Sequence, residues 1–457
     1  MKSAVQISCK KFKYSFSDEY ILQNLEMKIN FGEVTLLSGL SGCGKSTLLS
    51  LINGIIPRVI LGEFEGKIFI DGEDSSLKTM SQISRKVGSV LQNAESQIIH
   101  SIVEDEIAFG CENFGFDPSV IHDEIENSCR LMQINKNWKT RSLSGGQKQR
   151  LVTASTLAMK GDILIFDEPL ANLDAHGADI LLKLLRQLAS IGKAVLLVEH
   201  RLDVVLPFVD VIWQLKNKTV EKISDKESFL KNQTDIIEDK KENNITNSTN
   251  ALEIRNLKKS FGTRTILSDL NLDVKKSERL LLKGENGCGK STLMSIIAKL
   301  QKADSGTVTQ FLDAQLGKRS DKKWFKTCGV VYQNPNYQLF MSNVKDEILF
   351  GADDKEYALT LAKQFELEPL FSRHPHSLSE GQKRRVTVCA ILAQKPKLLL
   401  LDEPTVGQDY KTLQNMMMIL NTVHREQENT MISITHDIRC MNALSDRNIF
   451  ICDGRIK

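Results

Sequence analysis

The fold of this chain is decided by the stretch Gly39-Leu40-Ser41-Gly42-Cys43-Gly44-Lys45-Ser46-Thr47, which fits the pattern Gly-x-x-x-x-Gly-Lys-[Ser/Thr]. The apolar run Val34 to Leu37 precedes it and predicts a strand. The run Leu48 to Ile52 follows it and predicts the start of a helix. A strand, a glycine-rich loop and a helix in this order are the setting that a phosphate-binding loop requires.

Each residue type in this stretch has a physical reason to be there. Glycine adopts backbone angles closed to other residues and lets backbone N–H groups approach phosphate oxygens. The N-terminus of the following helix favours an anion, and Lys45 brings a positive charge to the outer phosphates. The hydroxyl of Ser46 is suited to a magnesium ion. The stretch therefore predicts a nucleoside triphosphate site.

The same pattern occurs a second time, as Gly284-Glu285-Asn286-Gly287-Cys288-Gly289-Lys290-Ser291-Thr292. It again follows an apolar run, Leu280 to Leu282, and again precedes a helical pattern. We call 39–47 and 284–292 the two phosphate loops. Two complete loops predict a duplicated nucleotide-binding unit.

Composition sets limits on the partners. The 457 residues carry 60 basic and 57 acidic side chains, so the formal charge of +3 predicts no nucleic-acid partner. The nine cysteines show no C-x-x-C pair and no metal-like spacing, which indicates a reducing cytosol. We expect no signal peptide and no membrane span, so any work at a membrane would go through a partner protein.

Strand-like runs alternate with helical patterns from each phosphate loop onward, which predicts an α/β fold. Residues 231–250 are rich in polar and amide side chains and read as a linker. The opening strand pattern returns after Ala251. We therefore predict a first domain at 1–230, a polar linker at 231–250 and a second domain at 251–457.

Four further landmarks occur in both halves in the same order. They are a glutamine after a short apolar run, a Leu-Ser-x-Gly-Gln segment, an apolar strand ending in Asp-Glu-Pro, and a histidine after a later strand. In the first half these are Gln92, Leu143-Ser144-Gly145-Gly146-Gln147, Asp167-Glu168-Pro169 and His200. In the second half they are Gln333, Leu378-Ser379-Glu380-Gly381-Gln382, Asp402-Glu403-Pro404 and His436. Ala171-Asn172-Leu173-Asp174 and Val406-Gly407-Gln408-Asp409 follow the two Asp-Glu-Pro segments.

With these landmarks both halves resemble the ATP-binding-cassette ATPases, and only the linker lies outside the resemblance. The resemblance implies two tandem P-loop NTPase domains, each with a mixed β-sheet core and a helical subdomain. It also implies hydrolysis of ATP with Mg2+. The residues expected to contact ATP are those of both phosphate loops together with Tyr14, Gln92, Ser144, Gly145, Gly146, Gln147, Phe261, Gln333, Ser379, Glu380, Gly381 and Gln382.

The resemblance also assigns chemical roles. Glu168 and Glu403 resemble the general base that polarises the attacking water, and His200 and His436 the histidine that supports it. The magnesium ligands, direct or through water, would be Ser46, Gln92, Asp167, Ser291, Gln333 and Asp402. Tyr14 and Phe261 resemble the aromatic platform for adenine, although an ordinary strand aromatic is the alternative.

The Leu-Ser-x-Gly-Gln segments, which we call the signature segments, give a reason for the duplication. In this family each one closes over the nucleotide held by the opposite domain, so the two halves form an intramolecular pseudo-dimer. Ser144 to Gln147 would then cap ATP at Lys290, and Ser379 to Gln382 would cap ATP at Lys45. Glu380 departs from the family pattern, which has glycine there. We expect the site to remain competent because Ser379 and Gly381 are kept.

The stretches that follow Gln92 and Gln333 indicate a subgroup within this family. Gln92-Asn93-x-x-x-Gln97 with Val103-x-Asp105-Glu106-Ile107-x-Phe109-Gly110 has a close counterpart from Gln333 to Gly351. This resembles the ATPase subunits of energy-coupling-factor (ECF) importers of vitamins and cobalt, including their fused double-cassette forms. The resemblance implies a polytopic membrane partner, the T component, docked on this surface, with a substrate-binding membrane subunit reached indirectly. It places the chain at the cytoplasmic face of the membrane.

Other assignments remain open at this stage. The tandem ATPase of another importer, for example of sugars, is one, although the second site of such proteins is commonly impaired. A double cassette that acts on ribosomes is another, but it would carry a long charged helical linker. A DNA-repair cassette would carry zinc-finger insertions, for which the cysteine spacing offers no support.

Overall fold

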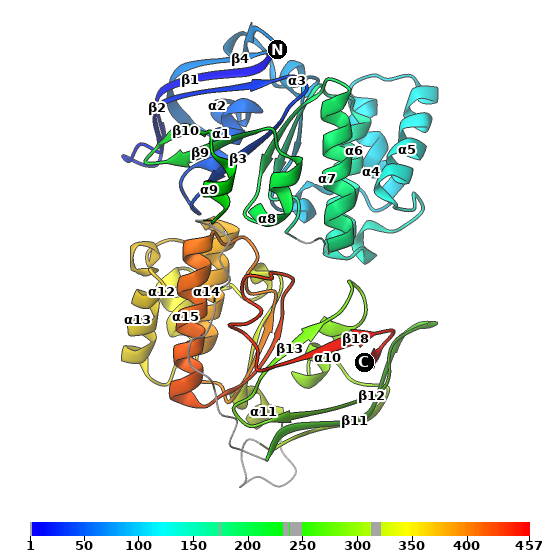
Figure 1. Cartoon of the computed structure of the whole chain (residues 1–457), viewed down its shortest axis with the longest axis vertical. Helices are drawn as coiled ribbons and strands as arrows, with labels where there is room; N and C mark the ends of the chain where they lie inside the picture. Colours follow the sequence, from blue (N-terminus) through cyan, green and yellow to red (C-terminus); the bar gives the residue numbers. More distant parts are fainter. Residues whose placement is uncertain (1, 172, 174, 232–236, 238–248, 312–320) are drawn as a thin grey trace. The chain divides into compact units, whose positions relative to one another are not determined.

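The computed structural model describes residues 2–171, 173, 175–231, 237, 249–311 and 321–457. The chain divides into two compact units, Met1–Thr234 and Asp235–Lys457, each taken here by itself (Figure 1). Most of the polar linker predicted at 231–250, as well as Asn172 and Asp174, lies outside the described residues. The predicted domain boundaries therefore stay predictions.

The first unit contains an antiparallel sheet in the order β2-β1-β4-β5. Its strands are β1 (Ser3–Tyr14), β2 (Leu22–Asn30), β4 (Gly62–Ile70) and β5 (Glu73–Asp74). Along β1, buried residues such as Val5, Ile7 and Cys9 alternate with exposed ones. Because successive side chains of a strand point to opposite faces, this alternation gives the sheet one core face and one outer face.

A second, six-stranded sheet has the order β10-β9-β3-β8-β7-β6. Its strands are β3 (Val34–Gly39), β6 (Val87–Val90), β7 (Ile163–Asp167), β8 (Ala194–Val198), β9 (Val211–Lys216) and β10 (Thr219–Ile223). All neighbours are parallel except β9 and β10. Strands β7 and β8 are buried along their whole length, as expected for parallel strands covered on both faces.

Helices of the first unit fall into two groups (Figure 1). One group lies with the sheets and includes α1 (Lys45–Ile52), α2 (Ile55–Arg58), α3 (Met80–Ser84), α7 (Ala175–Ser190), α8 (Leu202–Val205) and α9 (Lys226–Lys231). The other forms a helical subdomain of α4 (Val103–Asn113), α5 (Pro118–Met132) and α6 (Gly145–Ala158), in which all three helices contact one another. The helix α5 begins with Pro118, a residue suited to a first helical turn.

The second unit repeats this plan. Its smaller sheet has the order β12-β11-β14, with β11 (Asn250–Phe261), β12 (Arg264–Lys275) and β14 (Ser305–Gln310). Its larger sheet has the order β15-β16-β17-β13-β18-β19, with β13 (Arg279–Lys283), β15 (Cys328–Val331), β16 (Leu398–Asp402), β17 (Thr430–Ile434), β18 (Arg447–Cys452) and β19 (Arg455–Ile456). The helices are α10 (Lys290–Ile297), α11 (Asp321–Thr327), α12 (Val344–Leu349), α13 (Lys355–Gln364), α14 (Glu380–Ala393) and α15 (Tyr410–Gln427).

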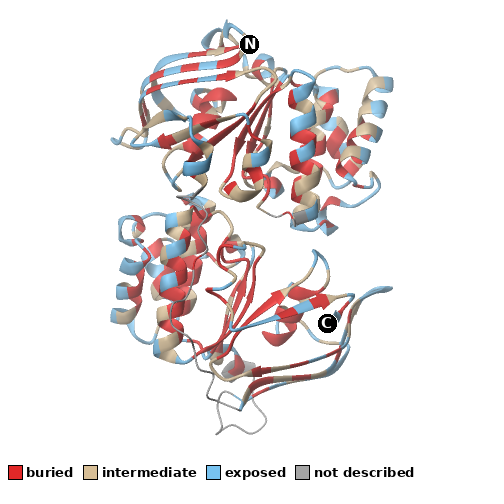
Figure 2. Cartoon of the chain, viewed as in Figure 1, coloured by how far each residue is buried: buried red, intermediate tan, exposed pale blue. Residues whose placement is uncertain are grey.

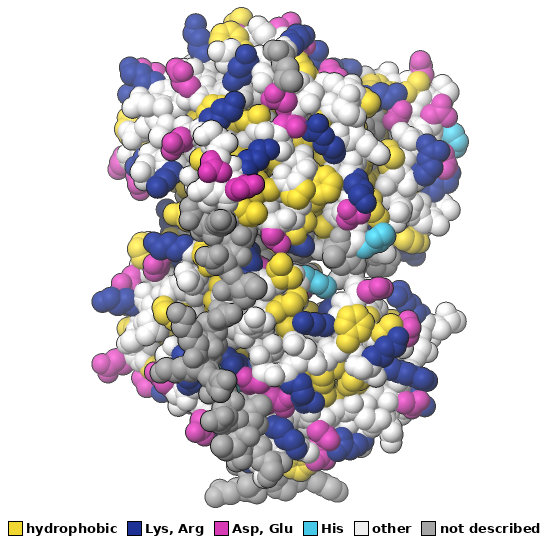
Figure 3. Space-filling view, viewed as in Figure 1, with side chains coloured by type: hydrophobic (Ala, Val, Ile, Leu, Met, Phe, Trp, Pro, Cys, Tyr) yellow, Lys and Arg dark blue, Asp and Glu magenta, His cyan; other side chains and the backbone are white. Residues whose placement is uncertain are grey.

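Each unit has its own hydrophobic core, which runs through the sheets and between the sheet and the helices (Figure 2). On the face shown in Figure 3, basic and acidic side chains are interspersed over both units. Within the part of the chain that the structure describes, no helix has the length and apolar character needed to cross a membrane. The predicted fold class, two tandem α/β domains with mixed sheets and helices, is confirmed.

Candidate functional site

Each phosphate loop joins the end of a central parallel strand to a helix, β3 to α1 and β13 to α10. Gly44 precedes α1 with φ of 109°, and a Cβ there would lie 2.9 Å from Ile21 Cγ2, so only glycine fits without strain. The ammonium of Lys45 donates to the carbonyls of Gly39 (2.8 Å) and Leu40 (3.0 Å). The loop thus curls around its own lysine.

The second loop has the same geometry. Lys290 Nζ donates to the carbonyls of Gly284 (2.7 Å) and Glu285 (2.8 Å), and Gly289 precedes α10 with φ of 106°. Both lysines are buried. Lys290 Nζ also lies 3.9 Å from Cys288 Sγ. A lysine ammonium inside a glycine-rich loop meets the electrostatic requirement of a phosphate site.

The order of strands brings the predicted magnesium ligands of the first half together. Strands β3 and β7 flank β8, and the carboxyl ends of all three meet at one edge of the sheet. Ser46 Oγ donates to Asp167 Oδ2 at 2.9 Å. The other oxygen, Asp167 Oδ1, is buried without a hydrogen-bond partner. A hydroxyl and an unsatisfied carboxylate oxygen are the ligands that Mg2+ prefers.

These residues therefore fit Mg2+ bound together with a nucleotide. The described residues hold no group of three or more His, Cys, Asp or Glu side chains placed for a metal ion. Mg2+ usually takes one or two protein ligands and completes its shell with water and substrate phosphates, so this finding is consistent with the prediction. In the second half the side chain of Ser291 is hydrogen-bonded to Asp402 in the same way. Bound Mg2+ neutralises the charge that develops on the phosphates.

The two glutamates that follow these aspartates have an uncommon backbone. Glu168 and Glu403 adopt φ of 51° and 50°, in the left-handed region that non-glycine residues rarely enter. Their N–H groups donate to the last residues of the neighbouring strands, Val198 (2.9 Å) and Ile434 (3.0 Å). Strained backbone held by its surroundings is concentrated at functional sites, and here it occurs at the same position in both halves.

Each glutamate contacts the histidine predicted to support it. His200 Nε2 lies 3.3 Å from Glu168 Oε1, and His436 Nε2 lies 3.6 Å from Glu403 Oε1. The backbone N–H of His436 also donates to Glu403 Oε2 at 3.3 Å. The side chain of Gln92 is hydrogen-bonded to Glu168 as well. The structure thus brings four predicted residues of the first half, Gln92, Asp167, Glu168 and His200, to one place.

The two carboxylate pairs differ in their electrostatics. Burial and the charge of Glu168 raise the pKa of Asp167 to about 7. Burial alone would raise the pKa of Glu168 too, but His200, Lys45 and Gln92 outweigh it and lower that pKa. In the second half, burial and the charge of Asp402 raise the pKa of Glu403 to about 8. In the absence of nucleotide and metal, Glu168 therefore ionises at a lower pH than Glu403.

An arginine distinguishes the second site further. Arg384 in α14 is buried, and its guanidinium donates to the carbonyl of Tyr332 at 3.2 Å, directly before Gln333. Burial lowers its pKa to about 10, and the charges of Glu380, Glu403 and Asp402 act against this shift. The first half has the neutral Gln149 at this position. The two sites are therefore similar in ligands but unequal in charge.

A second glutamine stabilises the loop after each predicted glutamine. Gln97 accepts from the N–H of Leu91 (2.7 Å) and donates to the carbonyl of Ser89 (3.2 Å). Gln338 does the same with Tyr332 (2.9 Å) and Val330 (2.6 Å). These bonds close the loop onto the strand that precedes it, β6 or β15. The motif that indicated a subgroup in the sequence thus has a structural role.

The glutamate of the same motif, Glu106 in the first half and Glu347 in the second, also has a structural role. The carboxylate oxygen Glu106 Oε2 accepts from the N–H groups of Ile99 (2.8 Å) and His100 (2.7 Å), and Glu106 is buried. Glu347 Oε2 accepts from Phe340 (2.9 Å) and Met341 (2.8 Å) in the same way. Each glutamate fixes the segment between the loop and the next helix. The sequence motif contained both glutamates, but it did not indicate that each one accepts hydrogen bonds from backbone N–H groups.

We expect Glu347→Ala to lower the free energy of unfolding of the second unit by about 1–3 kcal/mol, because two backbone N–H groups lose their acceptor. Urea unfolding of the full chain measures this, with Glu356→Ala, an exposed glutamate in α13, as the control. Unfolding curves that coincide for the two variants would contradict the role given to Glu347.

The signature segments form helix caps. Ser144 Oγ accepts from the N–H of Gln147 (3.3 Å), and Gln147 Oε1 accepts from the N–H of Ser144 (2.9 Å), at the start of α6. Ser379 and Gln382 make the same pair of bonds at the start of α14. This capping box leaves the N-terminus of a long helix open to an anion. Which nucleotide it faces depends on the placement of the two units and stays a prediction.

In the second half, Gln408 fixes the signature segment. Its Nε2 donates to the carbonyl of Gly381 at 2.8 Å, and Gln408 is buried. A Cβ at Gly381 would lie 2.5 Å from the carbonyl oxygen of Gly407, so no larger residue fits. The sequence marked the signature segment and the segment Val406 to Asp409 separately, and it did not indicate that they are in contact. The residue of the first half at the position of Gln408 is Leu173, whose side chain cannot donate a hydrogen bond.

Glu199 of the first half was not among the predicted site residues, although it lies next to His200. Glu199 is buried directly before His200, and its Oε1 accepts from the N–H of Leu170 at 2.7 Å, which holds the segment after Asp-Glu-Pro. The second half replaces this bond by one between the hydroxyls of Thr405 and Thr435 (2.8 Å). A carboxylate at the end of an otherwise apolar strand was the signal that could have identified it.

Of the two predicted adenine platforms, the first contacts its phosphate loop. Tyr14, at the end of β1, shares a hydrogen bond of 2.7 Å between its hydroxyl and Thr47 Oγ1. Phe261, at the end of β11, is half exposed. The stacking role of each aromatic stays a prediction.

Comparison with known proteins identifies the family. The family model described as ABC transporter matches residues 22–171 and again 267–406. A protein of Treponema denticola, provisionally named an ABC transporter ATP-binding protein, is 31% identical over 98% of this chain and 94% of its own length. A Bacillus subtilis protein, provisionally named the HMP/thiamine import ATP-binding protein YkoD, is 31% identical over 97% of this chain and 88% of its own.

Solved structures support the fold. A model of ribosome-bound archaeal Pelota and ABCE1 contains a chain that matches with a TM-score of 0.73 and 20% identity, over 98% of this chain and 77% of that one. The structure named RNase-L Inhibitor matches with a TM-score of 0.65 and 18% identity, over 98% and 89%. At these identities the likeness shows the tandem fold alone. The chain therefore belongs to the ABC transporter family, as a double-cassette ATP-binding protein whose two nucleotide-binding domains are ATPases.

Proposed function

We propose that this chain is the ATP-hydrolysing subunit of an importer of the energy-coupling-factor type, peripheral to the cytoplasmic face of the membrane. It would hydrolyse ATP with Mg2+ at two composite sites and drive a polytopic T component that carries a substrate-binding membrane subunit. The name of the Bacillus subtilis relative, an HMP/thiamine import protein, supports the import of a micronutrient. The geometry of the site residues supports the roles proposed for them.

In this mechanism the phosphate loops hold the nucleotide, and Asp167 and Asp402 with Ser46 and Ser291 would hold Mg2+. Glu168 and Glu403 accept a proton from the attacking water while the histidines keep their carboxylates in position. Each signature segment would complete the site of the opposite half. Closure around ATP and opening after hydrolysis then supply the movement.

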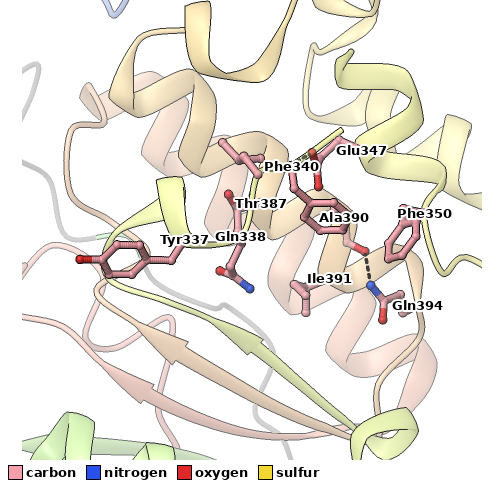
Figure 4. Close-up of a pocket in the computed structure, with 10 residues that line it drawn as sticks. Tyr337, Gln338, Phe340, Glu347, Phe350, Thr387, Ala390, Ile391 and Gln394 are labelled. Atoms are coloured by element: carbon pink, nitrogen blue, oxygen red, sulfur yellow. Dashed lines mark hydrogen bonds between the residues drawn. The ribbon is translucent and has the colours of Figure 1, made fainter. Parts of the chain in front are cut away.

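The single observation that carries the membrane role is an apolar groove in the second unit (Figure 4). A cavity of about 270 Å³ lies between the segment after Gln333, α12 and α14. Phe340 and Phe350 pack edge to face at its rim, with ring centroids 5.0 Å apart. Their side chains are 63% and 51% exposed. Large exposed apolar side chains around a hollow are typical of a docking surface.

The first unit presents large apolar side chains at the same two positions. Ile99 and Phe109 correspond to Phe340 and Phe350, and they are 68% and 37% exposed. Glu106 holds the backbone of this segment as Glu347 does in the second unit. Exposed apolar side chains at these two positions in both halves favour a partner that presents two docking segments, as a T component would.

We expect Phe340→Asp to reduce association with a polytopic membrane protein at least about tenfold, because a charge cannot be buried in an apolar groove without a partner. The tagged chain is captured from detergent-solubilised membranes of its source cell, and the captured subunits are identified by mass spectrometry. Met418→Asp is the matched control, because Met418 is similarly exposed (60%) but lies on α15. ATP binding is measured for each variant.

Loss of capture by Phe340→Asp alone, with ATP binding kept, supports the proposal. Equal capture by both variants would remove the groove from the interface. Capture of ribosomal proteins in place of a membrane subunit would favour the ribosome-acting class, and a sugar-specific membrane partner would favour the other importer class.

A further inference from the structure

The signature segment of the second half carries a carboxylate that the first one lacks. Glu380 is the first residue of α14, whereas Gly145 begins α6 in the first half. An acidic side chain in the first turn is favourable for a helix itself, because the N-terminus of a helix attracts anions. It is unfavourable for a bound nucleotide, because a free carboxylate repels the phosphates and competes with them for the same helix end. The second segment therefore needs a cation beside Glu380 if it is to receive ATP.

Lys383 supplies this cation. It lies one helical turn after Glu380, and its ammonium donates to Glu380 Oε1 at 2.9 Å. The side chains of Lys383 and Glu380 are 10% and 25% exposed, so water screens this pair less than an open surface pair. A second cation is close by. Burial lowers the pKa of Arg384 to about 10, and Glu380 is the carboxylate that opposes this shift most.

The lysine at the same position of the first half has a different partner. Lys148 also follows directly after its signature segment, and its ammonium donates to Glu95 Oε1 at 2.6 Å. Glu95 lies in the loop after Gln92, and its side chain is half exposed. The second half has the neutral Asn336 at the position of Glu95. The equivalent lysines therefore pair with the loop in one half and with the signature segment itself in the other.

We propose that Lys383 is a positioning residue that neutralises Glu380 and thereby keeps the N-terminus of α14 open to the phosphates of ATP held by the opposite half. This inference rests on the proposed completion of the Lys45 site by the segment Ser379 to Gln382. A lysine that only stabilised α14 would be needed whatever residue stood at position 380. A lysine that neutralises Glu380 becomes dispensable once that carboxylate is removed.

The test measures nucleotide trapped at the Lys45 site of the full chain, by vanadate trapping with 8-azido-ATP and peptide mapping. We expect Lys383→Met, which keeps the apolar stem and removes the charge, to reduce this trapping about tenfold, because Glu380 is left without its partner. At the Lys290 site the change should stay below about twofold, because salt screens a distant charge.

The decisive variant is Lys383→Met combined with Glu380→Gly, which introduces the residue of the first half. We expect it to restore trapping at the Lys45 site. Lys383→Arg keeps the charge and should keep the trapping. Lys148→Met is the matched control, because α6 has no carboxylate at the position of Glu380 and its signature segment should keep its function.

Two outcomes would overturn the inference. Unchanged trapping at the Lys45 site in Lys383→Met would mean that Glu380 needs no partner. A loss that Glu380→Gly does not restore would assign Lys383 a structural role in α14. Ser379→Ala separates these failures from that of the proposed function. If it leaves trapping at the Lys45 site intact, the second signature segment does not complete that site at all.

Discussion

The variant carrying both Glu168→Gln and Glu403→Gln is expected to lose ATP turnover by a factor of about 10² to 10⁴ while it still binds ATP. Glutamine keeps the size and the hydrogen-bonding oxygen of glutamate, so the contacts to His200 and His436 can be retained. It cannot accept a proton from water at neutral pH. Only the activation of the nucleophile is removed.

Phosphate release under saturating MgATP measures the turnover, and equilibrium binding of ATP shows that the sites remain intact. The single variants divide the activity between the sites. Because the pKa of Glu168 is lowered and that of Glu403 is raised, we expect Glu168→Gln to remove the larger share. Hydrolysis near the normal rate in the double variant would show that neither glutamate is the base.

Ser379→Ala is expected to reduce nucleotide trapping at the site of Lys45 by about 10²-fold, and at the site of Lys290 by much less. The reason is the proposed completion of each site by the signature segment of the opposite half, where loss of one well-placed donor has an effect of this size. Ser144→Ala is the reciprocal variant and should show the opposite preference.

This prediction is tested by finding which half of the chain carries the trapped nucleotide. Photolabelling with 8-azido-ATP after vanadate trapping, followed by peptide mapping, assigns the nucleotide to one phosphate loop or the other. Ser379 also caps α14, and its loss costs about 1 kcal/mol of stability, so Ser379→Thr, which keeps the cap and the hydroxyl, serves as the control. Weaker labelling at Lys290 alone would show that Ser379 serves its own half.

The differences between the sites bear on how the two ATP molecules are used. Arg384 and the raised pKa of Glu403 belong to the second site, whereas His200, Gln92 and Lys45 together keep Glu168 ionised at the first. Both sites keep the full set of predicted residues, which favours two hydrolytic events. The charges around them favour unequal rates.

Much of the site could be predicted because its motifs are local. A phosphate loop between a strand and a helix, or an Asp-Glu pair at the end of an apolar run, depends on neighbouring residues, and its repetition in both halves excludes coincidence. The α/β fold with two tandem domains followed from the same patterns. Gln97 and Glu106 belong to a motif that recurs in both halves, but the motif does not indicate which backbone groups they contact, because those partners come together only in the folded chain.

The sequence by itself determined the duplication, the two phosphate loops and the residue types that carry the chemistry. Only the tertiary structure decided that Gln408 donates a hydrogen bond to the carbonyl of Gly381 and that the ring of Phe16 stacks on that of Tyr14. It also decided that Phe340 and Phe350 line a cavity. The physical reason is the range of the forces involved. Backbone propensity and hydrophobic periodicity act over a few residues, whereas these contacts arise only after strands and helices have packed.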